Sequence, residues 1–432
     1  MASSRAERNR STLGILGPLA KTQAVGMMQA ELENEFMAIP IKYNVRNLKL
    51  RKGLTIMTAL GIALTVTTAI FLMALVAGLN RAFVSSGSPL NVLVMRKGSE
   101  SELTGGFDAS LFPTLKTLPG IAKDSHGEPM ASGEWNVVIV LPRKDGTGEV
   151  NVTVRGMMPD GLEMRQLPDK PGGPPKVKLV EGRWFEPGQR EVVVSKSIRE
   201  RFAHANIGDT MQFGKGPWKV VGVFDAGGSA YESEIWGDVN QMASDFDRQG
   251  GFSSAYLRAT DPVAADALTK RVSDDQRLKL DGMLETDYYA KQTSSGTPIK
   301  VIGFVVAIIM AVGSIFAAMN TMYAAVAYRG REIATLRVMG FSRPSILTSF
   351  VLESLILALL GAFVGILLML PFNGMQTGTS NAVTFSEVVF ALRITPQVAI
   401  NAIVFALVMG FVGGLAPAWH ASRQNILNAL RG

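Results

Sequence analysis

Four long hydrophobic runs stand out from the mixed polar and apolar pattern of the chain. They cover residues 54–79, 301–328, 345–370 and 397–419, and the only charged residue within them is Glu353. About 20 apolar residues cross the hydrocarbon core of a bilayer as an α-helix, so each run is long enough to span a membrane. The first run is too long for a cleavable signal peptide and lies too far into the chain. The pattern predicts a polytopic α-helical membrane protein with a transmembrane helix over each run, the second starting at residue 299.

Residues 80–298, between the first two runs, have the composition of a soluble domain. Short strand-like stretches such as Trp135–Leu141 alternate with Gly- and Pro-rich turns and with helical stretches such as Pro262–Arg277. A strand–helix unit opens this segment and another closes it. We therefore predict a large α/β domain of two subdomains, one formed by 80–130 with 250–298 and the other, 131–249, inserted into it.

The Lys and Arg residues that flank the runs predict the orientation of the chain in the membrane. Basic residues precede the first run and fill the 329–344 loop, whereas the 371–396 loop holds only Arg393, matched by Glu387. Loops rich in Lys and Arg stay in the cytoplasm. Both termini, including the 420–432 tail, and the 329–344 loop are therefore predicted to be cytoplasmic. Segment 80–298 and the 371–396 loop are then extracytoplasmic.

Two further segments precede the first run. Residues 37–53 mix aliphatic and basic residues, which predicts an amphipathic lead-in helix at the membrane surface, although an ordinary basic flank is the alternative. Its candidate lipid-facing cations are Lys42, Arg46, Lys49, Arg51 and Lys52. Residues 1–36 are Ser- and Arg-rich, then Gly- and Ala-rich, then acidic. We predict a disordered leader there, or a segment added ahead of a start at Met37.

The composition of the chain argues against several kinds of functional site. The chain has 43 Lys and Arg against 36 Asp and Glu, and this excess falls in the segments predicted to be cytoplasmic, so it indicates topology rather than nucleic-acid binding. Cysteine is absent, the three histidines are far apart, and no phosphate-binding loop occurs. We predict no catalytic residues, no metal site and no nucleotide bound by this chain. Five aromatic residues of the outer segment are candidates for an apolar cleft, with core packing as the alternative: Trp135, Trp184, Trp218, Trp236 and Phe252.

The loop between the second and third runs carries a short amphipathic pattern. In the stretch GREIATLRVMGFSR, residues 330–343, Ile333, Leu336 and Gly340 recur at helical spacing. A helix with an apolar stripe can enter a groove on a partner protein. The candidate docking residues are Arg331, Glu332, Ile333, Leu336, Arg337, Met339 and Gly340.

Small residues and one acid mark the transmembrane runs. Glycines at small-residue spacing allow close helix packing, although glycine is also simply tolerated in membrane helices. Glu353 is the one ionisable residue within a run and needs a partner there, as a packing or hinge residue or, less favoured, as a proton or substrate site. The candidate packing residues are Gly361, Gly365, Gly410, Gly413 and Gly414.

This order of elements resembles the FtsX-like and MacB-type permeases of ABC transporters, the type VII group. The resemblance rests on residues 331–368 and 417–432, and on 181–202 and 207–224, which are similar to the family's periplasmic core domain. It implies Porter- and Sabre-like outer subdomains and a bacterial inner-membrane location. It also implies that the 331–340 helix is a coupling helix.

The resemblance implies partners and a mechanism as well. Two copies of a separate cytoplasmic ATPase would hold ATP and Mg and would drive two permease chains, expected to form a homodimer. A periplasmic adaptor or membrane fusion protein is a possible further partner. Mechanotransmission would then export or extract a lipid, lipoprotein, peptide or hydrophobic compound. The alternatives are an ATPase-coupled regulator of a periplasmic cell-wall hydrolase and a membrane scaffold that transports nothing.

Overall fold

The computed structural model describes residues 39, 41–50, 52–169, 173–293, 297–381 and 384–424. The predicted leader and most of the C-terminal tail lie outside these residues. The chain divides into two compact units. We call them the helical unit, which comprises the chain up to Met73, Gly303–Pro371 and the chain from Ile394 on, and the outer domain, which comprises Ala74–Ile302 and Phe372–Arg393.

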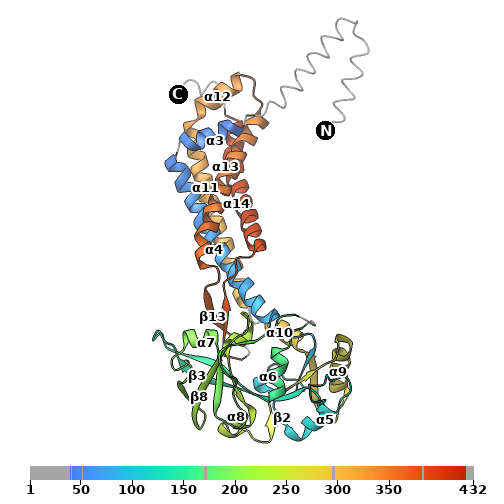
Figure 1. The fold of residues 1–432 in the computed structure, drawn as a ribbon. Coiled ribbons are helices and arrows are strands. Elements are labelled where there is room, and N and C mark those ends of the chain that lie inside the picture. The colour runs from blue at the N-terminus through green and yellow to red at the C-terminus, as the bar shows by residue number, and fades with distance from the viewer. Residues whose placement is uncertain are drawn as a thin grey trace, which may run out of the picture. The chain divides into compact units, whose positions relative to one another are not determined.

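The helical unit contains the long helices that the hydrophobic runs predict. Within the described residues, four helices are long and apolar enough to cross a membrane: α4 (Lys52–Val84), α11 (Thr297–Tyr328), α13 (Arg343–Met369) and α14 (Pro396–Ser422). The short helices α3 (Ile41–Leu50) and α12 (Gly330–Val338) belong to the same unit (Figure 1). The fold class predicted from the sequence is confirmed.

Local sequence signals determine where two of these helices begin. The side chain of Ser342 accepts a hydrogen bond from the backbone N–H of Ser345, with a proline in the first turn of α13. Thr395 does the same for Val398 at the start of α14. A Ser or Thr cap followed by proline satisfies the free N–H groups of the first turn.

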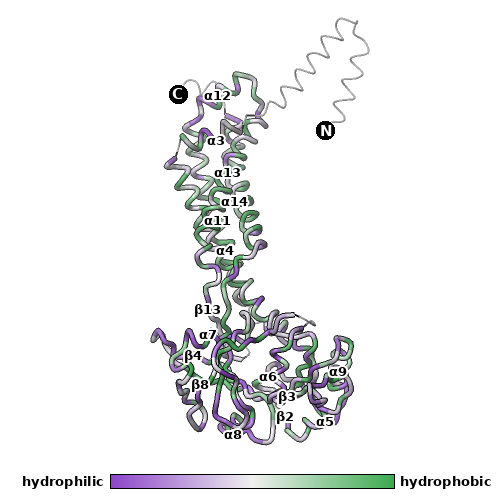
Figure 2. Tube along the Cα trace, in the orientation of Figure 1, coloured by the Kyte–Doolittle hydropathy of each residue, from purple (hydrophilic) through white to green (hydrophobic). Residues whose placement is uncertain are grey.

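Apolar side chains cover the outside of the helical unit as well as its interior. Figure 2 shows that hydrophobic residues predominate along the middle of the labelled helices α4, α11, α13 and α14. In α11, only 11% of the most apolar window is buried within the chain. Leucine, isoleucine and phenylalanine side chains exposed on this scale are unusual in a water-facing surface, and lipid is the solvent that suits them.

The outer domain is built on one large mixed sheet. In the described part of the chain it has ten strands in the order β12-β1-β11-β3-β4-β9-β6-β8-β5, with β7 paired to β8. The β4–β9 and β6–β8 pairs are parallel and the other pairs are antiparallel. The strands are β1 (Asn91–Arg96), β3 (Ala131–Pro142), β4 (Glu149–Met157), β5 (Lys178–Gly182), β6 (Glu191–Ser195), β7 (Thr210–Phe213), β8 (Gly216–Asp225), β9 (Glu234–Asp238), β11 (Ser254–Arg258) and β12 (Leu280–Leu284).

Short helices and a small two-stranded sheet complete the part of the outer domain between α4 and α11. The helices are α5 (Phe112–Lys116), α6 (Pro159–Gln166), α7 (Lys196–Arg201), α8 (Val239–Asp245), α9 (Pro262–Asp274) and α10 (Glu285–Thr293), and the small sheet pairs β2 (Phe107–Asp108) with β10 (Gly251–Phe252). The main sheet continues across the boundary drawn near residues 130 and 250, because β3 pairs with β11 on one side and with β4 on the other. The division into two subdomains therefore stays a prediction.

The loop between α13 and α14 folds as part of the outer domain. It forms a hairpin of β13 (Gln376–Ser380) and β14 (Glu387–Ala391). The backbone N–H of Val389 donates to Ser233 Oγ at 2.7 Å, and Val388 and Phe390 lie in an outer-domain hydrophobic cluster. The sequence predicts only an extracytoplasmic loop here, because no periodic pattern distinguishes so short a hairpin.

Candidate functional site

The loop between α11 and α13 contains the helix that the amphipathic pattern predicts. α12 ends because Gly340 adopts a φ of +98°, in the left-handed region that glycine occupies without strain. The N–H of Gly340 donates to the carbonyl of Arg337, and the N–H of Phe341 donates to the carbonyl of Leu336. This pair of bonds is a Schellman cap, which satisfies the last carbonyls of the helix. Gly340 thus ends the helix.

α12 has one apolar face that packs on the chain itself and another that is exposed. Ile333 is buried in a cluster of the helical unit, and Leu336 packs against the same cluster. Val338 and Met339, by contrast, are 65% and 58% exposed. A stripe can be read from the sequence, but which side the rest of the chain covers depends on the tertiary structure. The outward apolar residues are therefore Val338 and Met339.

The buried cation Arg329 joins α12 to two other helices. Its Nη1 donates to Glu353 Oε2 of α13 at 2.7 Å, and its Nε donates to Glu332 Oε2 of α12 at 3.2 Å. The guanidinium also lies 5.4 Å from the ring of Tyr43 in α3 and 4.9 Å from the ring of Phe350. Tyr43 in turn donates its hydroxyl proton to Glu332 Oε2 at 3.1 Å. We call these five residues the Arg329 junction.

Sequence reasoning found two members of the Arg329 junction as candidate site residues and missed the cation. Glu353 was expected to need a partner, and the structure supplies Arg329, whose side chain is 4% exposed. The available signal was that the basic 329–344 loop lies within reach of a buried acid. Four arginines in that loop satisfied this condition equally well, so the sequence could not choose among them.

The candidate glycines lie where helices approach most closely. A Cβ on Gly410 would lie 2.5 Å from the Cβ of Ala358, and one on Gly361 would lie 2.7 Å from Ile62 Cγ2. A Cβ on Gly365 would meet Ala63 O at 3.0 Å. Gly414 faces Ser354 in the same way, and a Cβ on Gly413 would lie 3.2 Å from Ala318. Because glycine has no side chain, these positions let the backbone of α13 approach the backbones of α4 and α14 closely.

The lead-in segment contains helix α3. Leu48 on this helix is buried in the helical unit, whereas Arg46 and, at the start of α4, Lys52 are exposed. These positions leave the two cations available to solvent or lipid headgroups. Arg51 and the side chains of Lys42 and Lys49 lie outside the described part of the chain.

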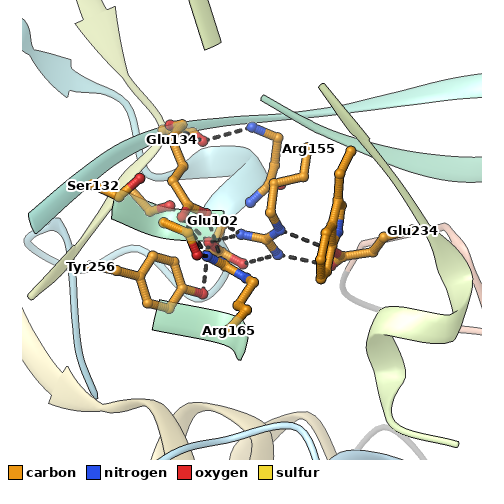
Figure 3. A network of polar contacts seen from close by, with 12 residues as sticks. Glu102, Ser132, Glu134, Arg155, Arg165, Glu234 and Tyr256 are labelled. Atoms are coloured by element: carbon orange, nitrogen blue, oxygen red, sulfur yellow. Dashed lines mark hydrogen bonds and ion pairs between the residues drawn. The ribbon is translucent and has the colours of Figure 1, made fainter. Parts of the chain in front are cut away.

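A second buried ionic cluster lies inside the outer domain (Figure 3). Arg155 of β4 contacts Glu102 and Glu134 at 2.8 Å each, and Glu234 of β9 at 2.8 Å. Arg165 of α6 contacts Glu134 at 2.7 Å. The side chains of all five residues are no more than 9% exposed. The cluster ties strands β3, β4 and β9 to α6, and Glu102, Arg155 and Glu234 also line a small cavity of about 60 Å³.

The charge of Glu102 in this cluster is strongly stabilised. Burial works to raise its pKa, but the charge of Arg155 and hydrogen bonds from Arg155 and Ser254 outweigh burial and hold the pKa below the ordinary value. Tyr256 also donates its hydroxyl proton to Glu102 at 3.1 Å. These residues lie far apart in the chain and show no common motif, so no sequence signal could have grouped them.

A further buried acid holds the β13–β14 hairpin. Glu387 Oε1 accepts a hydrogen bond at 2.6 Å from Arg143, which follows β3, and another at 2.6 Å from Arg201 of α7. The side chain of Asn151 donates to the carbonyl of Phe385 at 2.9 Å. In the sequence, Glu387 stands out only as the negative charge that offsets Arg393 in the 371–396 loop. In the structure, Glu387 fastens the hairpin to the sheet.

Comparison with known proteins identifies the family. Residues 55–275 match the MacB-like periplasmic core domain, and residues 304–426 match the FtsX-like permease C-terminal region. These two matches cover most of the chain. The chain therefore belongs to the family of MacB-type, FtsX-like ABC transporter permeases.

Two curated relatives and one solved structure are among the proteins to which the chain is similar. The macrolide export ATP-binding/permease protein MacB of Pasteurella multocida is 24% identical over 87% of this chain and 57% of its own length. The uncharacterized ABC transporter permease YknZ of Bacillus subtilis is 26% identical over 87% of this chain and 94% of its own length. The periplasmic region of MacB from Actinobacillus actinomycetemcomitans covers 47% of this chain at 15% identity with a TM-score of 0.35, and 92% of that chain is covered. This chain spans about half the length of the curated MacB relatives it matches.

Family and fold together define the class of the protein. It is an ABC transporter permease with four helices suited to span a membrane and a large α/β domain of the MacB periplasmic type. These features fit a protein of the inner membrane with an extracytoplasmic domain.

Proposed function

We propose that this chain is the membrane subunit that couples a separate cytoplasmic ATPase to movement of the outer domain. The work would export or extract a lipid, lipoprotein, peptide or hydrophobic compound on the outer side. The observation that carries the proposal is α12, which ends on the exposed Val338 and is followed by the exposed Met339, while the buried Arg329–Glu353 ion pair anchors the residue that precedes the helix. A helix that is fixed at one face and free at the other suits force transfer from a docked partner.

The Arg329 junction would transmit movement of α12 to the rest of the helical unit. Arg329 binds Glu353, eleven positions into α13, and stacks on Tyr43 of α3. Because α12 is short and its inner face is buried, a push on its outer face would move these three helices together rather than bend a loop. Packed interiors transmit strain in this way because they are close-packed.

The first two long helices would carry the movement outward. α4 has 33 residues and α11 has 32, and each contributes residues to both the helical unit and the outer domain. At 1.5 Å per residue, each helix is about 50 Å long, compared with about 30 Å for a hydrocarbon core. The proposal places α12 and both termini in the cytoplasm, ATP and Mg on the ATPase, and two permease chains in a homodimer.

The docking claim is tested by changing the exposed apolar face of α12. Val338→Asp puts a charge where an apolar groove is expected, and should lower co-purification of the proposed cytoplasmic ATPase, and its ATP turnover, by tenfold or more. The matched control is Val263→Asp, because Val263 is a 78% exposed valine of the outer domain. Undiminished ATPase binding by the Val338 variant, in membranes that contain normal amounts of the chain, would contradict the proposal.

A further inference from the structure

An open groove of about 500 Å³ crosses one region of the outer domain, beside the small β2–β10 sheet. Its lining includes Phe107, Trp135 and Arg248, together with glycines that contribute no side chain. Volumes of 300–1,000 Å³ with an apolar lining and a few polar groups are typical of small-molecule sites. The groove lies outside the Arg329 junction, and the Arg155 cluster is not part of its lining.

The polar atom that marks the groove is the indole nitrogen of Trp135. This side chain is 9% exposed, and its Nε1 has no hydrogen-bond partner in the described part of the chain. The ring atom Cζ2, which shares a neighbour with Nε1, lies 3.6 Å from the position of a Cβ on Gly251 in the groove lining. Trp135 and Gly251 are both part of the groove lining, so this unpaired donor belongs to a side chain that borders the groove. A buried donor without an acceptor costs free energy that a ligand oxygen would recover.

Arg248 supplies a positive charge beside the same ring. Its guanidinium lies 5.2 Å from the centre of the Trp135 ring, and the exposed side chain makes no ion pair within the described residues. A guanidinium held over an aromatic face keeps its N–H edge free for a carboxylate. Asp108 is the acid in the lining, and hydrogen bonds from Ser110 lower its pKa, so it is ionised and repels an anion.

The remaining lining leaves room for an apolar body. Phe107 packs against Phe252 with ring centres 6.1 Å apart, which makes a firm aromatic wall. A Cβ on Gly106 or Gly250 would meet nothing within 4 Å, so the space above both glycines is open. Glycine at such positions lets a ligand approach the backbone closely.

We propose that this groove binds a small apolar or aromatic molecule that carries a carboxylate. The carboxylate accepts from Trp135 Nε1 and from Arg248, and the apolar body lies along Phe107 over Gly106. The inference does not depend on the ATPase, so its failure would leave the proposed coupling function untouched.

The test is binding of 2-naphthoate to the full chain in phospholipid nanodiscs, measured by saturation-transfer NMR with empty nanodiscs as the baseline. Neutral 2-naphthylmethanol, which has the same ring system, should bind roughly tenfold more weakly, since a hydrogen bond to a charged group contributes about 1.5–3 kcal/mol. Arg248→Gln should weaken 2-naphthoate binding by a similar factor and Trp135→Phe by several-fold.

Three further variants protect the test against misfolding. Gly106→Val places its Cβ in open space, with no atom of the described fold within 4 Å, and should abolish binding. Asp108→Asn should instead tighten binding, because it removes the opposing charge and keeps an acceptor for Ser110. Arg277→Gln, on an arginine whose side chain is 87% exposed elsewhere in the outer domain, should change nothing. Equal binding of acid and alcohol, no binding at several millimolar, or indifference to both Arg248→Gln and Gly106→Val would overturn the proposal.

Discussion

At the scale of single residues, buried ion pairs hold the elements of each unit together. Glu353 sits in an apolar helix, where an unpaired carboxylate would be very costly, and Arg329 neutralises it at 2.7 Å. Arg155 and Arg165 do the same for three carboxylates of the outer domain. Both sets are buried, and their effect is to hold elements in one arrangement.

The Arg329–Glu353 pair should behave as a coupled unit in a double-mutant cycle. Arg329→Gln or Glu353→Gln alone leaves one buried charge without its partner, and should lower the free energy of unfolding of the detergent-solubilised chain by about 3–5 kcal/mol. The double variant removes both charges and should lose clearly less than the sum of the two. Arg46→Gln, at an exposed arginine of α3, is the control. Strict additivity in thermal unfolding would show that the two side chains are independent.

The lowered pKa of Glu102 predicts a pH dependence of outer-domain stability. Because its folded-state pKa lies below the ordinary value of 4.5, its contribution to stability is complete above about pH 4.5 and is lost as the pH falls through the folded-state pKa. Glu102→Gln should therefore flatten the loss of stability on acidification. Four of the five tryptophans lie in the outer domain, so their fluorescence in a Trp419→Phe background reports its unfolding.

A matched change elsewhere in the outer domain separates this effect from acid unfolding in general. Glu186 has a 66% exposed side chain, so Glu186→Gln should keep the acid sensitivity of the unaltered chain. If Glu102→Gln unfolds along the same pH profile as Glu186→Gln, the assignment to Glu102 is wrong.

At the scale of elements, glycine residues, which have no side chain, set how closely the helices pack. Gly410 on α14 lies against Ala358 of α13 so closely that no Cβ fits between them, whereas Gly313 on α11 has nothing within 4 Å. The two glycines look alike in the sequence, since both interrupt a hydrophobic run. Only the tertiary packing shows that α13 requires glycine at position 410, whereas none of the described neighbouring residues requires it at position 313.

These two glycines should respond differently to the same substitution. Gly410→Val would force α13 and α14 apart, and should lower the free energy of unfolding by about 1–3 kcal/mol or more, the usual cost of overpacking. Gly313→Val projects into open space and should leave stability within about 0.5 kcal/mol. Thermal unfolding of both variants in the same detergent makes the comparison. Equal losses would mean that helix propensity, not packing, sets the cost.

At the scale of the whole molecule, charge asymmetry and chain topology set which segments face which compartment. The outer domain is built from two segments of the chain, Ala74–Ile302 and Phe372–Arg393, since the end of α4 and the start of α11 belong to it and the β13–β14 hairpin returns to it between α13 and α14. If the basic 329–344 loop is cytoplasmic, all of these segments must lie on the opposite side of the membrane.

The absence of cysteine makes this topology directly testable. Single-cysteine variants at two exposed positions, Val263→Cys in the outer domain and Met339→Cys after α12, introduce the only thiol of the chain. In spheroplasts, a membrane-impermeant maleimide should label the first and not the second, and should label both after lysis. Labelling of Met339→Cys in intact spheroplasts would reverse the proposed orientation.

The sequence by itself determined the long helices and the kind of domain between the first two. Charge-free runs longer than a bilayer is thick are rare outside membrane spans, and helix caps such as Ser342 with Pro344 are local signals that no distant contact can easily override. The α12 helix and its glycine stop could be predicted for the same reason. Its hydrogen bonds and its cap all lie within a dozen residues.

The tertiary structure alone decided which of these residues meet. It selected Arg329 from four arginines as the partner of Glu353, and turned Ile333 and Leu336 inward while leaving Val338 exposed. It also folded the 371–396 loop onto the outer domain through Glu387, and left Trp135 at a groove while it buried Trp218 and Trp236 completely. Each outcome depends on contacts between residues far apart in the chain, whereas periodicity and composition report only on neighbours.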